Sequence, residues 1–353
     1  MQPPAADAPA ERFEPDAPGP GPSRVSVVRT VLSVGVGLAL LGFLIYHADV
    51  DQIHDRMDEI GPWSPLVALP WMFIACIDAL GWRCALPPAA AARVPFHSLV
   101  LVRMAGEAIN SITPTGAIGG EPVKAHLLRA WGVPASDSLA SIVIAKTALT
   151  VSQSVFVVLG VAALCELWGR RGLGTVLAIV LLVATAGFGM MLVRLQRRRP
   201  AAMVWSWARR LASRSRFLAR LESGAHAIDE RLADFYRIEP GSFWRASSWH
   251  LLGWLLGVTE VMLIMYLIGA PVGWLEALVI EALSQPIRAA AVIIPGGLGT
   301  QEVGGVALCG LLGMGEGAAA TLWLLKRGRE LVFDGVGLAY LVRRSGFRTS
   351  RSP

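Results

Sequence analysis

Two segments of the sequence combine ionisable side chains with proline and glycine in the same order. The first reads RMAGEAINSITPTGAIGGEPVKAHLL over 103–128, and the second reads EALSQPIRAAAVIIPGGLGTQEVGG over 281–305. In each, a polar approach with Arg and Glu leads to a proline, a glycine-rich break and a glutamate seven positions after the proline. Proline ends a helix and glycine lets the backbone turn and approach closely. Each segment therefore predicts a broken helix with charged groups beside the break.

Charged groups beside a helix start can bind ions or lipid headgroups. New helices are expected near Glu121 and Thr300, where free N–H groups and the helix dipole favour an anion such as a lipid phosphate. Glu121 and Glu302 fall in those first turns. They could cap the helix starts themselves, pair with a cationic group of a substrate, or carry a coupling proton.

Other ionisable residues also fall in apolar surroundings, where they are costly and usually face a partner or a cavity. A structural network of ion pairs explains any one of them as well as a transport role does, but their joint presence favours a polar site. The full set is Arg103, Glu107, Glu121, Lys124, Lys146, Glu260, Glu281, Arg288, Glu302, Lys326, Arg327, Arg329, Glu330 and Asp334.

The elements that must position these residues are membrane helices. Of 353 residues, 54% are hydrophobic and only 16% are charged, against about a quarter in soluble domains. Several apolar runs are long enough to cross a hydrocarbon core of about 30 Å. The composition excludes most classes of cytosolic enzyme and predicts an all-α, polytopic membrane helix bundle. The basic excess accompanies no nucleic-acid-binding motif, so no nucleic acid is expected as a partner.

Six full spans are expected, with the two broken segments either re-entrant in an inverted repeat or crossing completely. The spans are predicted at 27–48, 63–84, 139–165, 173–194, 248–269 and 318–342. Residues 1–24 are expected to be a disordered tail, 25–345 the membrane domain, 197–245 a basic amphipathic segment on the inner leaflet, and 346–353 a tail. Segment 194–245 holds twelve arginines against five acids, and positive loops stay cytoplasmic. Both termini are therefore expected in the cytoplasm.

The same motifs resemble the lysylphosphatidylglycerol synthetase transmembrane-region family of flippase-like membrane proteins. GEAINSITPTGAIGGEPVKAHLL at 106–128 and IIPGGLGTQEVG at 293–304 carry the resemblance. The second element, with LLKRGRELVFDGVGLAYL at 324–341, is similar to the branch associated with hopanoid biosynthesis. The resemblance implies an integral inner-membrane protein that moves a lipid between leaflets, without the soluble aminoacyltransferase domain.

By position, the resemblance adds Asn110 to the ionisable candidates and draws attention to the prolines and glycines. The substrate-binding or translocation candidates are then Arg103, Glu107, Asn110, Glu121, Lys124, Arg288, Glu302, Lys326, Arg327 and Glu330. The residues expected to shape the helix breaks are Pro114, Gly119, Gly120, Pro295, Gly296, Gly297 and Gly299.

The leading hypothesis is a lipid translocator, with membrane lipids that are anionic or bear a headgroup as its partners. One alternative is a membrane-embedded lipid-modifying transferase in which Glu107 or Glu121 acts as a base. Another is a non-transporting subunit that recruits enzymes of lipid biosynthesis through 194–245. No HExxH, GxSxG, P-loop or Cys/His metal spacing occurs, so we expect no metal and no cofactor. The sequence identifies no protein partner.

Overall fold

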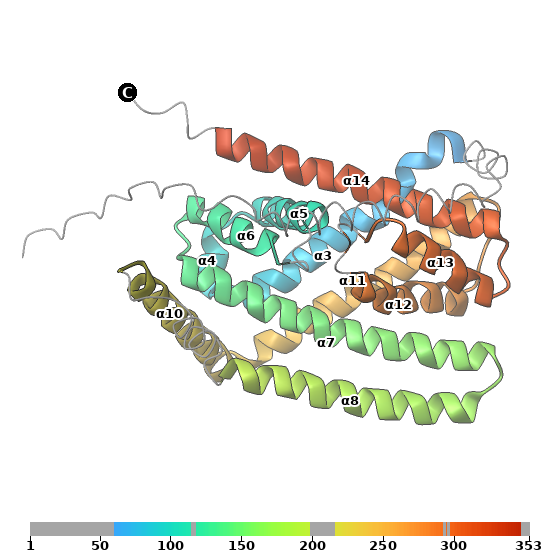
Figure 1. Ribbon diagram of the computed structural model, residues 1–353, viewed down its shortest axis with the longest axis horizontal. Helices are drawn as coiled ribbons and strands as arrows, with labels where there is room; N and C mark the ends of the chain where they lie inside the picture. Colours follow the sequence, from blue (N-terminus) through green and yellow to red (C-terminus); the bar gives the residue numbers. More distant parts are fainter. Residues whose placement is uncertain (1–59, 114–117, 198–215, 292–293, 295–296, 347–353) are drawn as a thin grey trace, which may run out of the picture.

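A computed structural model of the chain describes residues 60–113, 118–197, 216–291, 294 and 297–346. Within these residues every regular element is a helix and none is a strand, which confirms the expected all-α bundle. The predicted span 27–48, the predicted tail 1–24 and residues 347–353 of the other predicted tail lie outside the described residues. Figure 1 shows the helices arranged along one long axis.

In the part of the chain that the structure describes, four helices are long and apolar enough to cross a membrane. They are Gly61–Ala85, which comprises η1 (Gly61–Ala68) and α3 (Leu69–Ala85), then α7 (Ala135–Leu167), Gly172–Gln196 within α8 (Arg171–Arg197), and α11 (Pro240–Leu267). Each contains most of a predicted span. α11 begins at Pro240 rather than at 248, because proline suits the first turn of a helix. Of the predicted basic segment 197–245, residues 198–215 lie outside the described residues, and the part after them is divided between α10 (Arg216–Ile238) and the start of α11.

The predicted span 318–342 lies within α14 (Glu316–Gly346). This helix is long enough to cross a bilayer, at about 1.5 Å per residue. It is not one of the four apolar helices, because five charged residues interrupt its middle between Lys326 and Asp334. Its place in the bundle therefore depends on partners for those charges.

Both interrupted segments form helical hairpins with a break between two helices. In the first, α4 (Pro88–Arg93) leads to α5 (Phe96–Ile112), which packs against α6 (Gly120–Leu128) before the short η2 (Arg129–Trp131). In the second, α12 (Trp274–Ala290) packs against α13 (Thr300–Leu311). The helix starts at Gly120 and Thr300 match the predicted positions. Figure 1 shows α5 and α6 toward one end of the long axis and α12 and α13 toward the other.

The two hairpins belong to two halves with the same order of elements, because α3, α5, α6 and α7 recur as α11, α12, α13 and α14. Glu302 follows Glu121 by 181 positions (302 − 121), and α14 begins 181 positions after α7 (316 − 135). α7 starts at the end of the molecule where α14 finishes (Figure 1). The fold is therefore an inverted repeat, an arrangement that in transporters places the site between the repeats.

Two apolar cores lie on either side of the hairpin tips. We call the end that holds α4, η2, α10 and the end of α14 the basic end, and the opposite one the far end (Figure 1). The core of the basic end includes Trp82, Leu99, Ile144, Tyr236 and Phe243, and the other core includes Phe156, Ile264, Ile280, Leu322 and Trp323. The outer face of α8 is mostly exposed and apolar, as expected of a surface that faces lipid.

Glycines allow the closest approaches within the hairpins. A Cβ atom on Gly120 would overlap the carbonyl oxygen of Gly106 in α5, and one on Gly305 would overlap the ring of Trp323. At the second break, Gly297 and Gly299 have φ angles of 61° and 72°. Residues other than glycine rarely adopt such positive φ angles. Gly120 and Gly305 therefore need glycine for space, and Gly297 and Gly299 need it for their backbone conformation.

Gly120→Ala is expected to lower the free energy of unfolding by about 1 to 3 kcal/mol, because the added methyl group has no room between α5 and α6. The measurement is the thermal unfolding midpoint of the purified protein in detergent. Gly310→Ala in α13 is the matched control, since its Cβ would meet no atom within 4 Å and alanine favours a helix. Equal midpoints for the two variants would contradict the close packing.

Candidate functional site

Ion pairs connect the first hairpin internally and to α7. The Lys124 ammonium of α6 donates a hydrogen bond to Glu107 Oε1 of α5 at 2.6 Å. Lys124 also lies 3.4 Å from Glu121, in the first turn of α6, and Lys146 of α7 lies 2.8 Å from the same carboxylate. Two lysines and two glutamates thus form one network across three helices.

Asn110 joins the two helices of the first hairpin at the break. Its Oδ1 accepts a hydrogen bond of 2.7 Å from the backbone N–H of Gly120, one of the donors that a helix start leaves unpaired. Its Nδ2 lies 3.4 Å from two carboxylates of the network. Gly119 has an ordinary helical φ of −62°. Pro114, Pro295 and Gly296, also expected to shape the breaks, lie outside the described residues.

A buried trio joins α3, α5 and α11. Asp78 accepts a hydrogen bond of 2.7 Å from Arg103, and its other oxygen lies 2.8 Å from His250 Nδ1. The sequence analysis included Arg103 but missed Asp78 and His250. Each is an isolated polar residue in an apolar run, and the two are 172 positions apart. The available signal was an aspartate within a predicted span.

A second network of ion pairs joins α11, α12 and α14. Lys326 donates a hydrogen bond of 2.5 Å to Glu281 and lies 3.6 Å from Glu260. Glu260 lies 2.9 Å from Arg329. All four side chains are almost completely buried. The charges of α14 are therefore compensated by carboxylates on neighbouring helices.

The start of the second hairpin's α13 repeats the pairing seen at α6. Glu302 in its first turn accepts a hydrogen bond of 2.5 Å from Arg327, which lies 25 residues later in the chain. Lys146 likewise follows Glu121 by 25 residues, and that pair also joins a first turn to the next long helix. The inverted repeat thus extends to its ion pairs. Each of the two glutamates is ion-paired with a basic side chain of the same chain.

Glu330 extends the Glu302–Arg327 pair toward the middle of the molecule. It accepts hydrogen bonds from Arg288 of α12 at 2.6 Å and from Arg327 at 3.0 Å. Arg288 remains one-third exposed. A cation from the second hairpin therefore reaches the space between the two halves.

A cavity of about 460 Å³ lies between the two networks, within the size range of small-molecule sites. Lys146, Glu107 and Arg288 are the most exposed of its ion-paired side chains, at 39%, 38% and 33%. They come from α7, α5 and α12. The charged lining consists of Asp78, Arg103, Glu107, Lys146, Glu260, Glu281, Arg288, Arg329, Glu330 and Asp334.

The structure divides the predicted candidates between the cavity and the packing around it. Glu121 and Lys124 line a small cavity of about 40 Å³ that shares four lining residues, Arg103, Glu107, Lys146 and Leu149, with the large one. Glu302, Lys326 and Arg327 are buried behind the wall, with side chains 2%, 3% and 11% exposed. Four of the predicted candidates line the large cavity itself: Arg103, Glu107, Arg288 and Glu330.

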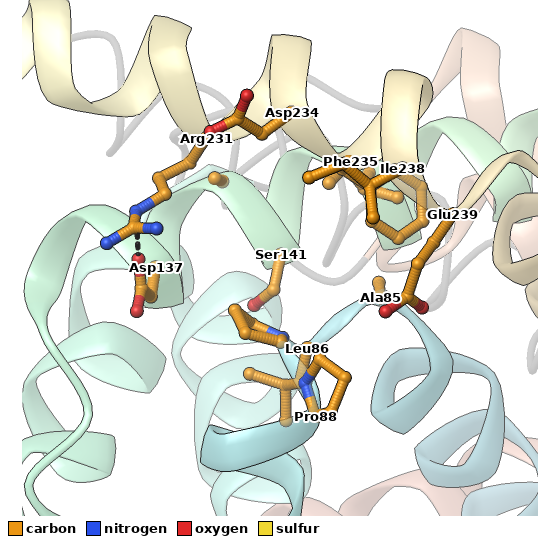
Figure 2. Close-up of a pocket in the computed structure, with 13 residues that line it drawn as sticks. Ala85, Leu86, Pro88, Asp137, Ser141, Arg231, Asp234, Phe235, Ile238 and Glu239 are labelled. Atoms are coloured by element: carbon orange, nitrogen blue, oxygen red, sulfur yellow. Dashed lines mark ion pairs between the residues drawn. The ribbon is translucent and has the colours of Figure 1, made fainter.

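A separate cavity of about 160 Å³ lies at the basic end, beneath α10. Figure 2 shows Phe235 and Ile238 of α10 above Leu86 and Pro88, with Arg231 reaching Asp137 of α7. That ion pair measures 2.7 Å. The cavity contains none of the predicted candidates, and its contacts hold α10 against α7.

The large cavity offers cations suited to a phosphate and carboxylates suited to a proton or an amine. Lys and Arg both bind phosphate oxygens, Arg through a planar fork of donors. Within the described residues, no group of three or more His, Cys, Asp and Glu is placed to hold a metal ion. The charged groups that line the cavity can bind a ligand through ion pairs and hydrogen bonds.

Comparison with known proteins identifies the family. The model of the lysylphosphatidylglycerol synthase TM region matches residues 30–336. A UPF0104 membrane protein of Methanothermobacter thermautotrophicus is 24% identical over 280 residues, which covers 76% of this chain and 81% of that protein. No solved structure gives a significant match. The chain belongs to the lysylphosphatidylglycerol synthase TM region family and is an integral membrane protein.

Lys326→Met is expected to lower the free energy of unfolding by about 3 to 5 kcal/mol, because Glu281 would be buried without its cation. Denaturation of the detergent-purified protein measures the loss. Adding Glu281→Gln should restore much of it, since no uncompensated carboxylate then remains there. A double variant as unstable as Lys326→Met would argue against the pairing.

Arg237→Ala is the control for this experiment. It breaks an exposed pair with Asp234 on α10, and such pairs contribute at most about 1 kcal/mol. A loss comparable to that of Lys326→Met would show that burial is not what makes the central pairs important.

Proposed function

We propose that this member of the lysylphosphatidylglycerol synthase TM region family moves a membrane lipid between the two leaflets. The headgroup enters the central cavity, while the acyl or polycyclic part stays in the bilayer. The observation that supports the proposal is the charged cavity of about 460 Å³ between two inverted hairpins. Broken backbone and charged side chains exist at membrane depth only when protein buries them or water fills the space beside them.

The position of the exposed cations suggests how a headgroup is held. Lys146 belongs to the first half and Arg288 to the second, and both line the cavity. A phosphate between them would bind both cations beside their carboxylate partners Glu121 and Glu330, which stay in place, so each cation stays compensated throughout. The cargo in this proposal is a lipid with an anionic headgroup, whether its apolar part is glycerol-based or hopanoid.

The distribution of arginine supports an orientation in the inner membrane with the basic end in the cytoplasm. At the basic end, the described helices carry seven arginines near their first or last turns: Arg83, Arg93, Arg129, Arg237, Arg245, Arg343 and Arg344. At the far end, the turn from α7 to α8 holds Arg170 and Arg171, and the turns at 268–273 and 312–315 hold no basic residue. Positively charged loops remain on the cytoplasmic side. Both chain termini are then cytoplasmic.

Arg288→Gln and Lys146→Gln should each slow lipid movement by roughly tenfold or more, since a hydrogen bond to a charged group contributes about 1.5 to 3 kcal/mol. The assay uses liposomes with headgroup-labelled anionic lipid and a quencher that does not cross the membrane. Arg237→Gln, the same change on exposed α10, should match the wild type. No protein-dependent exposure of label would refute translocation. Equal rates for Arg288→Gln and Arg237→Gln would place the headgroup elsewhere.

The proposed orientation predicts which end a membrane-impermeant maleimide reaches. In a chain without its four native cysteines, Glu316→Cys should be labelled in right-side-out inner-membrane vesicles, and Arg237→Cys only in inside-out vesicles. The two positions lie at the start of α14 and near the end of α10. The reverse pattern would invert the orientation.

A further inference from the structure

We call the acids and bases that form the ion pairs described above among α3, the two hairpins, α7, α11 and α14, together with Asp334, the central cluster. Among the residues that the structure describes, ion pairs compensate every acid of this cluster but one. Seven acids can be matched one to one with seven bases at 2.9 Å or less. The pairs are Asp78 with Arg103, Glu107 with Lys124, Glu121 with Lys146, Glu260 with Arg329, Glu281 with Lys326, Glu302 with Arg327, and Glu330 with Arg288. Asp334 is the eighth acid. Within the part of the chain that the structure describes, it has no cation at ion-pair distance.

Asp334 lies on the wall of the large cavity, one helical turn after Glu330. Its side chain interacts with Ser111 of α5. α5 and α14 pack closely here, because Gly337 brings the two backbones together at Met104. The titratable and charged groups around the same cavity are Asp78, Arg103, Glu107, Lys146, Glu260, Glu281, Arg288, Arg329 and Glu330, and Arg327 approaches from α14 itself.

We propose that Asp334 is the proton-carrying residue of the translocation cycle. It takes up one proton when an anionic headgroup occupies the cavity and releases it when the headgroup leaves on the other side. This inference rests on the proposed lipid translocation. Its chemistry is the reversible conversion of the carboxylate to the carboxylic acid, with the proton coming from and returning to water and no bond of the lipid changed.

The charge balance explains why Asp334, rather than another acid, would carry the proton. The seven matched pairs sum to zero, and the Asp334 carboxylate adds one negative charge that none of them balances. A headgroup with one negative charge would add a second, which is costly at low dielectric constant. A proton on Asp334 restores the original balance. A proton on any of the seven matched acids would instead leave a buried cation without its partner.

This stoichiometry makes a quantitative prediction. One proton and one singly charged lipid move together without net charge, so a pH gradient drives the lipid and a membrane potential does not. One pH unit corresponds to a factor of ten in an equilibrium. The lipid should therefore accumulate in the leaflet that faces the alkaline side, approaching tenfold for each pH unit.

The experiment uses the full chain in phosphatidylcholine vesicles that contain acyl-labelled phosphatidylglycerol. A membrane-impermeant reductant reports the leaflet distribution, and a trapped dye reports the luminal pH. The wild type should show the pH-driven asymmetry, with no response to a potassium diffusion potential. Asp334→Asn should abolish the asymmetry, and Asp334→Glu should retain it. Asp234→Asn on exposed α10 is the matched control and should behave as the wild type.

The outcomes separate the two proposals. A wild type that moves phosphatidylglycerol without pH-driven asymmetry, or an Asp334→Asn variant that keeps the asymmetry, would overturn the proton role and leave translocation standing. Absence of protein-dependent lipid movement would refute translocation instead.

A second measurement tests Asp334 without requiring transport. Adding an ether-linked phosphatidylglycerol, which has no ester carbonyl, to the protein in nanodiscs at fixed pH should produce an infrared C=O band that shifts in heavy water, as a protonated carboxyl group does, and Asp334→Asn should lack it. Absence of the band in the wild type, or an unchanged band in the variant, would overturn the proposal. Thermal midpoints of all variants establish that they are folded.

Discussion

The structure depends on ion pairs that compensate charged side chains inside the helix bundle. These pairs lie between the two apolar cores. An isolated charge at membrane depth is costly, and breaking a buried pair leaves its partner uncompensated. The pairs connect helices distant in sequence, as Lys326 connects α14 to Glu281 of α12 and Glu260 of α11. The register of α14 against its neighbours is therefore set largely by where its cations meet carboxylates, since its own apolar character is weak.

The inverted repeat places these ion pairs near the middle of the long axis. The second helix of each hairpin begins toward the middle of that axis (Figure 1). Glu121 and Glu302 occupy equivalent positions, and each pairs with a cation 25 residues later. Between them remains a cavity whose exposed cations, Lys146 and Arg288, come from different halves. Movement of one half against the other would change the distance between these two groups.

Sequence reasoning located the helix breaks well, because proline and glycine act locally, and α6 and α13 begin where the motifs indicate. It also collected most of the charged residues, since charges in apolar runs are rare. It could not assign partners, because pairs such as Asp78 with His250 form only when distant helices pack. Nor could it distinguish Arg288, which lines the cavity, from Glu302, which is buried behind the cavity wall, because both belong to the same interrupted segment. Burial is a property of the assembled bundle.

The charged middle of α14 also constrains how the protein is made. On scales of membrane insertion, a charge at the centre of a helix costs about 2.5 to 3.5 kcal/mol, and α14 carries five charged residues between Lys326 and Asp334. It is the last described helix to leave the ribosome, after the carboxylates of α11, α12 and α13 that pair with its cations. The order of synthesis thus supplies the counterions before the helix that needs them, and insertion of α14 is coupled to assembly of the bundle.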